Sequence, residues 1–194
     1  MYKRCTTERA ALQQRRIEEC LLTQMRKQDY RDITVSALCE QAALSRKTFY
    51  RLFGSKEDVL QALIDHTLMD YAKFRLPPEQ IQPESPAELQ RFFAYWLANK
   101  PLLDALTISR QSALLLEQAI AHVLYEDHSA LRWFCADRCD YTVEATVFYI
   151  SAIVGLLLNW HYTGFNRSAA EMASILQHLM SSPPVTDFNL LNNL

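Results

Sequence analysis

Apolar residues recur three and four positions apart along most of the chain, and the strict alternation of a half-buried β-strand is not found. Two-residue hairpin signals are also absent, and the chain has only 3 glycines. With 49% apolar residues in a length of 194, the chain can bury a substantial core. The pattern therefore predicts an all-α fold.

The most specific pattern lies between Thr34 and Asp58. Thr34 is placed to cap a short helix, 35–41, and Ser45 is placed to cap a second helix after a turn of about three residues. Short helices joined by so tight a turn cross steeply, which is the arrangement that presents a second helix to the DNA major groove. The spacing therefore predicts a helix-turn-helix.

The second of these helices has two different faces. Phe49, Leu52 and Phe53 share the side that we expect to be buried. The other side carries Arg46, Lys47, Thr48, Tyr50 and Arg51. Such donors suit phosphate oxygens and the guanine edge, and no acidic residue occurs between 41 and 56. The alternative is a solvated basic face on an ordinary three-helix unit, which the coincidence of caps, turn and aromatic anchor disfavours.

A third helix follows at once. Gly54 ends the preceding helix, and Ser55-x-x-Asp58 has the spacing of an N-terminal capping box. Lys56 then stands near a helix N-terminus, where free amides would also attract phosphate.

These residues resemble the TetR family of dimeric transcription regulators. The resemblance covers about the first third of the chain and rests on Ile33-Thr34-Val35, Leu44-Ser45-Arg46, Thr48-Phe49-Tyr50 and Phe53-Gly54-Ser55-Lys56-Glu57. It implies a DNA-binding set of Thr34, Ser45, Arg46, Lys47, Thr48, Tyr50, Arg51 and Lys56. Within that set, Thr34, Thr48, Tyr50 and Lys56 would contact the DNA backbone, and Arg46, Lys47 and Arg51 would carry sequence preference. The chain departs from the family at Ala43, where many members have glycine, and at Lys47, where many have a small residue.

The distribution of charge also separates the first third of the chain from the rest. Residues 1–58 hold 12 Lys and Arg against 8 Asp and Glu, a charge of +4, whereas the whole chain carries −2. A basic front and an acidic remainder are expected if only the front meets a polyanion.

Caps and apolar stripes also locate the later helices. The fourth helix runs from Ser55 past Tyr71, and a loop is expected at 76–85 because four prolines lie between 77 and 86. The helices expected after it are one capped by Ser85 with Pro86 at its first position, then 102–108, 113–125, 141–162 and one capped by Ser168. We expect a DNA-binding domain at 1–55, a helical regulatory and dimerisation domain at 56–182, and a tail at 183–194, with the long fourth helix joining the two domains.

The segment 141–162 is apolar on nearly every side. Its longest apolar run, 147–158, is 12 residues long and contains Ser151, so it is shorter than the ~20 residues that a bilayer requires, and we expect no signal peptide before the chain. We therefore expect a cytoplasmic protein with no membrane partner, and a second copy of the chain to cover this helix. The predicted dimer interface comprises Ala152, Gly155, Asn159, Ile175 and Leu179. Family resemblance likewise implies that the last two helices pair with their twins and that the operator is a near-palindrome.

An unusual number of aromatic residues falls in the expected regulatory domain. They usually pack as core, but members of the family commonly hold a small molecule there. The predicted effector site comprises Phe93, Trp96, Tyr125, Trp133 and Tyr149. The expected function is a repressor that a small-molecule effector releases from DNA.

Other chemistry finds little support in the sequence. Cys135 and Cys139 lie one helical turn apart, but with His128 and His161 they lack recognised ligand spacing, so no metal or cofactor is expected. No catalytic motif is present, and an enzyme is not expected. The alternative function is a TetR-like adaptor that acts through protein–protein contacts, docking through 183–194 or the acidic carboxyl-terminal surface.

Overall fold

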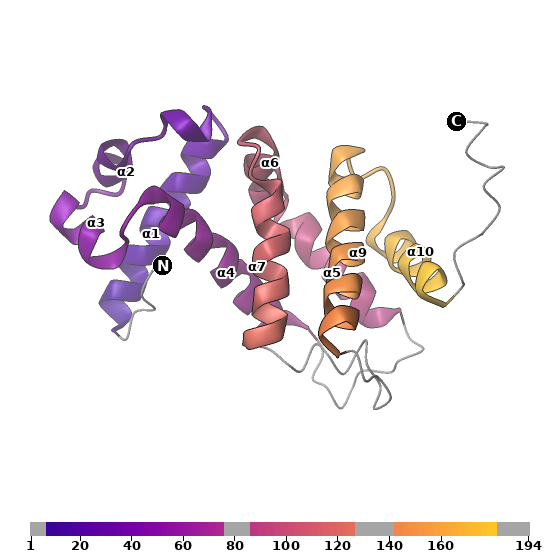
Figure 1. Ribbon diagram of the computed structural model, residues 1–194. Coiled ribbons are helices and arrows are strands. Elements are labelled where there is room, and N and C mark those ends of the chain that lie inside the picture. The colour runs from indigo at the N-terminus through magenta and orange to yellow at the C-terminus, as the bar shows by residue number, and fades with distance from the viewer. Residues whose placement is uncertain (1–6, 76–85, 127–141, 182–194) are drawn as a thin grey trace.

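The computed structural model describes residues 7–75, 86–126 and 142–181 (Figure 1). Over these ranges every regular element is a helix and no strand occurs. The predicted all-α fold is confirmed.

The amino-terminal elements form a unit around α1. They are α1 (Glu8–Met25), the short 3-10 helix η1 (Tyr30–Asp32), α2 (Val35–Gln41), α3 (Arg46–Leu52) and α4 (Lys56–Phe74). Helix α1 packs against α2 and α4, and α2 packs against α3. Ile17, Leu21, Leu38 and Phe49 are completely buried where these helices meet. The predicted bounds of α2 and the predicted caps of α3 and α4 are confirmed.

Helix α4 joins this unit to the rest of the molecule, since it contacts α1, α5 and α7. Two polar pairs fix it to α1. Arg15 donates to Asp70 at 3.0 Å, and the buried carboxylate of Glu18 lies 2.9 Å from the Nδ1 atom of His66. The predicted mechanical link between the two halves is therefore a continuous helix held on both sides.

The remaining described helices are α5 (Ala87–Ala98), α6 (Lys100–Ile108), α7 (Ser112–Tyr125), α9 (Thr142–Tyr162) and α10 (Ala169–Ser181). Helix α9 lies alongside α7, and α10 packs against α5 (Figure 1). Helix α5 starts one residue later than predicted, because Pro86 is its N-cap, and Ser85 lies outside the described residues. The cap at Ser168 is confirmed: its Oγ accepts a hydrogen bond from the amide of Glu171 at 3.2 Å, and its own amide donates to the Glu171 carboxylate at 2.7 Å.

Helix α9 contains a stretch, Val143–Tyr162, with a mean hydropathy of 1.6, which by length and composition alone is long and apolar enough to cross a membrane. This is weak evidence for a span, because core helices of soluble proteins pass the same test.

Candidate nucleic-acid interface

The two caps of the helix-turn-helix are formed by the predicted residues. Thr34 Oγ1 accepts a hydrogen bond from the amide of Ala37 at 3.2 Å, and Ser45 Oγ accepts one from the amide of Thr48 at 3.1 Å. Each hydroxyl replaces an acceptor that the first turn of a helix lacks. Both residues are exposed, so their hydroxyl groups stand at the surface.

The turn between α2 and α3 depends on Ala43. Its φ of 51° is in the left-handed region, and the next amide, that of Leu44, donates to the carbonyl of Cys39 at 2.9 Å. This bond and the left-handed residue form the usual helix-ending motif, for which glycine is the preferred residue. Alanine therefore keeps the geometry at a conformational cost.

Helix α3 is anchored by its apolar face and exposes its basic one. Phe49 is completely buried, and its ring meets the half-exposed ring of Tyr50 edge-on at 5.4 Å. Arg46, Lys47 and Arg51 are all exposed. The Arg51 guanidinium donates to Gln13 of α1 at 3.2 Å. The structure thus brings the predicted cations of α3 together on its solvent-facing side.

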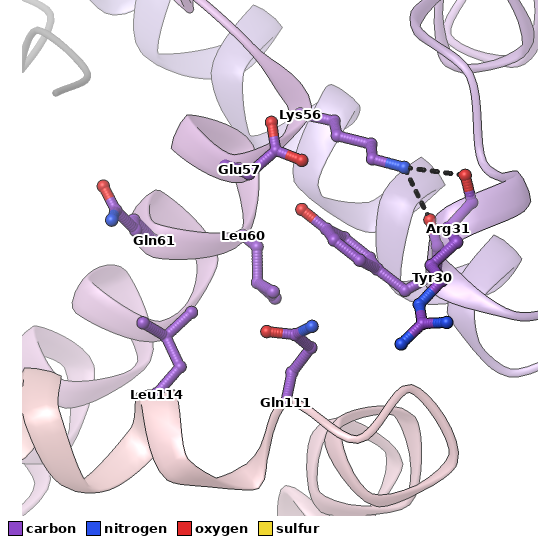
Figure 2. Close-up of a pocket in the computed structure, with 8 residues that line it drawn as sticks. All are labelled: Tyr30, Arg31, Lys56, Glu57, Leu60, Gln61, Gln111 and Leu114. Carbon is purple, nitrogen blue, oxygen red and sulfur yellow. Dashed lines mark hydrogen bonds between the residues drawn. The ribbon is translucent and has the colours of Figure 1, made fainter.

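Lys56 has a different position from the one expected of a phosphate contact. Its ammonium group donates to three carbonyl oxygens at the end of η1, those of Tyr30 at 2.7 Å, Arg31 at 3.1 Å and Ile33 at 2.9 Å. It also lies 4.5 Å from the centre of the Tyr30 ring (Figure 2). An ammonium has three donors, and all are used within the protein. Lys56 therefore ties η1 to α4.

A pocket of about 500 Å³ lies beside Lys56, between the amino-terminal unit and the start of α7. Leu60 of α4 and Leu114 of α7 line its apolar part, and Gln111 lies between α7 and Tyr30 (Figure 2). Burial, reinforced by the negative charge of Glu57, raises the pKa of Tyr30 far above its usual range. The sequence carries no local signal for this pocket, because it forms only when α4 and α7 pack together.

The predicted effector residues are not gathered around one described cavity. Phe93 and Trp96 are buried core side chains, and Phe93 packs edge-on against Trp160 at 5.5 Å. Tyr125 ends α7 with 78% of its surface exposed. Trp133 lies outside the described residues, as do Cys135 and Cys139.

The predicted dimer residues lie together instead. Ala152, Gly155, Asn159 and Leu179 line one groove of about 630 Å³ between α9 and α10, and Tyr149, expected in the effector site, lines it too. Ile175 is partly buried against the core. Phe148 and Leu179 in the groove are 68% and 59% exposed, so a large apolar surface faces solvent.

Residues 22–63 match the family model described as bacterial regulatory proteins, tetR family. This range contains α2, the left-handed turn, α3 and the start of α4. The chain carries the DNA-binding unit of the tetR family. Transcription regulation through DNA binding is the function common to that family, and the resemblance seen in the sequence is thereby confirmed.

Similarity to known proteins extends beyond residues 22–63. An uncharacterised HTH-type transcriptional regulator of Bacillus subtilis, YxbF, is 27% identical over 139 residues, covering 68% of this chain. The matched region spans only 34% of that relative's length.

Solved structures show the same fold over most of the chain. A TetR transcriptional regulator from Streptococcus agalactiae has a TM-score of 0.62 at 16% identity, covering 89% of this chain and 95% of its own. Lin0861 from Listeria innocua has a TM-score of 0.63 at 17% identity, covering 91% of this chain and 94% of its own. The helical fold of these two structures therefore extends through the helices of this chain that follow residues 22–63.

Proposed function

We propose that this protein is a repressor that binds a near-palindromic DNA operator as a homodimer and is released by a small-molecule effector. The observation that carries the proposal is the two-faced helix α3. Its buried aromatic face fixes the helix, and its exposed face presents Arg46, Lys47 and Arg51 without an acidic residue among them. A duplex groove lined by phosphates and base edges complements that surface.

The residues divide by role. Arg46 and Lys47, in the first turn of α3, would read base edges, with Arg51 further along the same helix. The hydroxyl groups of Thr34, Ser45 and Thr48 and the phenol of Tyr50 would position the backbone phosphates. Lys56 is left out of this set because its donors are engaged by carbonyl groups.

A second copy of the chain would cover the groove between α9 and α10. The small side chains at Ala152 and Gly155 permit close approach, and Phe148 and Leu179 supply apolar surface that an isolated chain leaves in water. Figure 1 shows this groove's two helices at the opposite end of the molecule from α3. Pairing through α9 and α10 would leave helix α3 of each copy free to enter the DNA. The two α3 helices would lie about 34 Å apart if they occupy successive turns of the major groove.

Release by an effector would act through α4, because this helix contacts both the DNA-binding unit and the helices after it. The rings expected to hold the effector do not surround a common described cavity, so this step rests on the family resemblance. A cytoplasmic location follows from the same proposal, since that is where an operator is reached.

Duplexes selected from a random pool and used in mobility-shift titrations test the DNA-binding step. We expect retardation that strengthens as salt falls, and a loss of at least about 30-fold in affinity for Arg46→Ala plus Lys47→Ala, since a good base contact contributes about 1–3 kcal/mol. Arg91→Ala plus Lys100→Ala, an equal charge change on α5 and α6, is the matched control and should bind as the wild type does.

Equal affinity of wild-type and Arg46/Lys47 variants would contradict the proposal and favour the adaptor function. A selected site without twofold symmetry would contradict the homodimer. Screening metabolites against the preformed complex tests release, and an operator affinity that no compound alters would exclude the effector step.

A further inference from the structure

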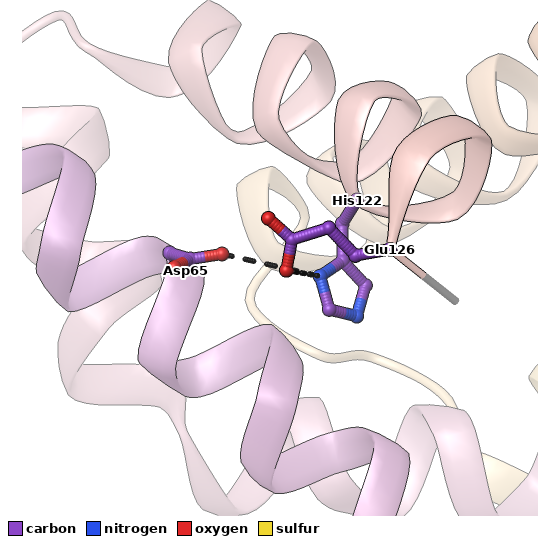
Figure 3. Close-up of side chains that lie close together, drawn as sticks. All are labelled: Asp65, His122 and Glu126. Atoms are coloured by element: carbon purple, nitrogen blue, oxygen red, sulfur yellow. Dashed lines mark ion pairs between the residues drawn. The ribbon is translucent and has the colours of Figure 1, made fainter. Parts of the chain in front are cut away.

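Three ionisable side chains from two helices meet behind the DNA-binding unit. Asp65 extends from the middle of α4, His122 extends from the last turn of α7, and Glu126 is the residue that caps the carboxyl end of α7 (Figure 3). Their ligand-type atoms all lie within 4.8 Å of one another. The Nδ1 atom of His122 is 3.9 Å from a carboxylate oxygen of Asp65 and 3.7 Å from one of Glu126.

The imidazole is the unusual member of this cluster. Its side chain is only 9% exposed, and among the described residues neither ring nitrogen has a hydrogen-bond partner. Both carboxylates are too distant for a good hydrogen bond to it. A buried polar group without a partner costs about 1–3 kcal/mol, so such groups are rare without a function.

We propose that Asp65, His122 and Glu126 bind a divalent transition-metal cation. One imidazole and two carboxylates form a mixed nitrogen and oxygen set that suits Zn²⁺ and Mn²⁺ and includes no thiolate. The donors of a tetrahedral Zn²⁺ site, each about 2.1 Å from the ion, are about 3.4 Å apart. The two observed separations of 3.9 and 3.7 Å exceed that spacing by only a few tenths of an ångström. The widest separation among the three ligand atoms is at most 4.8 Å, about 1.4 Å more than the tetrahedral spacing, so rotations of the carboxylate side chains would be needed to close the site.

The surroundings favour a held ion over a loose surface association. The side chain of Asp65 is 11% exposed and that of Glu126 is 38% exposed, so the site is closed on the α4 side and open near the end of α7. With three protein ligands, a fourth position would be filled by water or by an exogenous ligand entering from that open side. The ion would also clamp α4 to α7, a contact that the proposed DNA binding does not require.

The test uses the full chain, stripped with chelator and titrated with Zn²⁺ and, separately, with Co²⁺ as a spectroscopic substitute. We expect one bound equivalent, a raised thermal midpoint, and a Co²⁺ spectrum with ligand-field bands but without a thiolate charge-transfer band. Loss of an outer-shell partner typically costs 10–100-fold in metal affinity, so loss of a ligand in His122→Ala should cost at least about 100-fold.

Two further variants separate this site from any other. Asp65→Asn, nearly equal in shape, should weaken the metal while circular dichroism shows an unchanged helical content. His178→Ala removes an exposed histidine of α10 and should bind as the wild type does. Absence of Zn²⁺ binding, binding unaffected by both His122→Ala and Asp65→Asn, or a thiolate band with Co²⁺ would each overturn the proposal.

Discussion

The ammonium nitrogen of Lys56 lies 2.7 Å from the carbonyl oxygen of Tyr30, and two further carbonyl groups take its remaining donors. A residue that the sequence places among the DNA contacts therefore holds the loop before α2 against the first turn of α4. Because α2 and α3 follow directly from that loop, the orientation of the helix-turn-helix depends on the ammonium group of Lys56.

Lys56→Met should lower the free energy of unfolding by about 2 kcal/mol, because carbonyl groups that now accept charge-assisted bonds would lose their donor. Urea unfolding followed by circular dichroism measures it. Lys47→Met is the matched control: it removes an exposed cation of α3 and should change stability by less than about 0.5 kcal/mol while weakening DNA binding. A Lys56→Met protein as stable as wild type, with reduced salt dependence of DNA binding, would restore the phosphate role.

Ala43→Gly should stabilise the protein by up to about 1 kcal/mol. Glycine relieves the left-handed strain at φ 51°, and part of this gain is offset by the greater freedom of the unfolded chain. Ala43→Val should destabilise by more than about 1 kcal/mol, since a branched side chain is poorly tolerated there. Thermal and urea unfolding compare the variants.

The neighbouring Ala42 is the control for that substitution. It is completely buried with a φ of −76°, so Ala42→Gly should destabilise by about 1 kcal/mol. Stabilisation by glycine at both positions would show that the turn is not the source of the effect.

Leu179→Glu should dissociate the homodimer. A charge placed in the groove between α9 and α10 would be desolvated on pairing, and loss of a central apolar contact there should raise the dimer dissociation constant by about 30-fold or more. Sedimentation over a range of concentrations measures it. Leu97→Glu alters another exposed leucine, on α5 outside the groove, and should leave the assembly unchanged. A wild-type chain that sediments as a monomer would contradict the proposed pairing.

Cys20 and Cys39 should resist alkylation in the folded protein. Burial is the main cause that raises the pKa of both thiols above the usual value, so at neutral pH they stay protonated, and the thiol form is a poor nucleophile. Iodoacetamide labelling at pH 7.5 followed by mass spectrometry should modify both only after denaturation. Rapid native labelling of Cys39, which borders α3, would instead favour a redox role at the DNA-binding unit.

Sequence patterns predicted the short-range features well. The caps at Thr34, Ser45 and Ser168 depend on residues three positions away, and the bounds of α2 follow from them. The left-handed conformation at Ala43 could be anticipated only from the family resemblance, because many members have glycine at that position.

Features made by packing could not be predicted in this way. The carbonyl partners of Lys56 lie on η1, and the meeting of Asp65 with His122 requires α4 to pack on α7. The exposure of Tyr125 has a similar origin, since its position at the end of α7 places the ring beyond the core. The sequence identified the aromatic residues of the expected regulatory domain, but only the packing of the helices shows which rings are buried and which are exposed.

Helix α4 has 19 residues and so forms a rod about 28 Å long, held near its start by Lys56 and along its length by α1 and α7. A rod of that length acts as a lever, and a tilt of only about 5° at one end moves the other by about 2.5 Å. In a symmetric homodimer the displacements of the two copies would add. A shift smaller than the length of a side chain in each copy could therefore move the two α3 helices out of register with successive turns of the duplex.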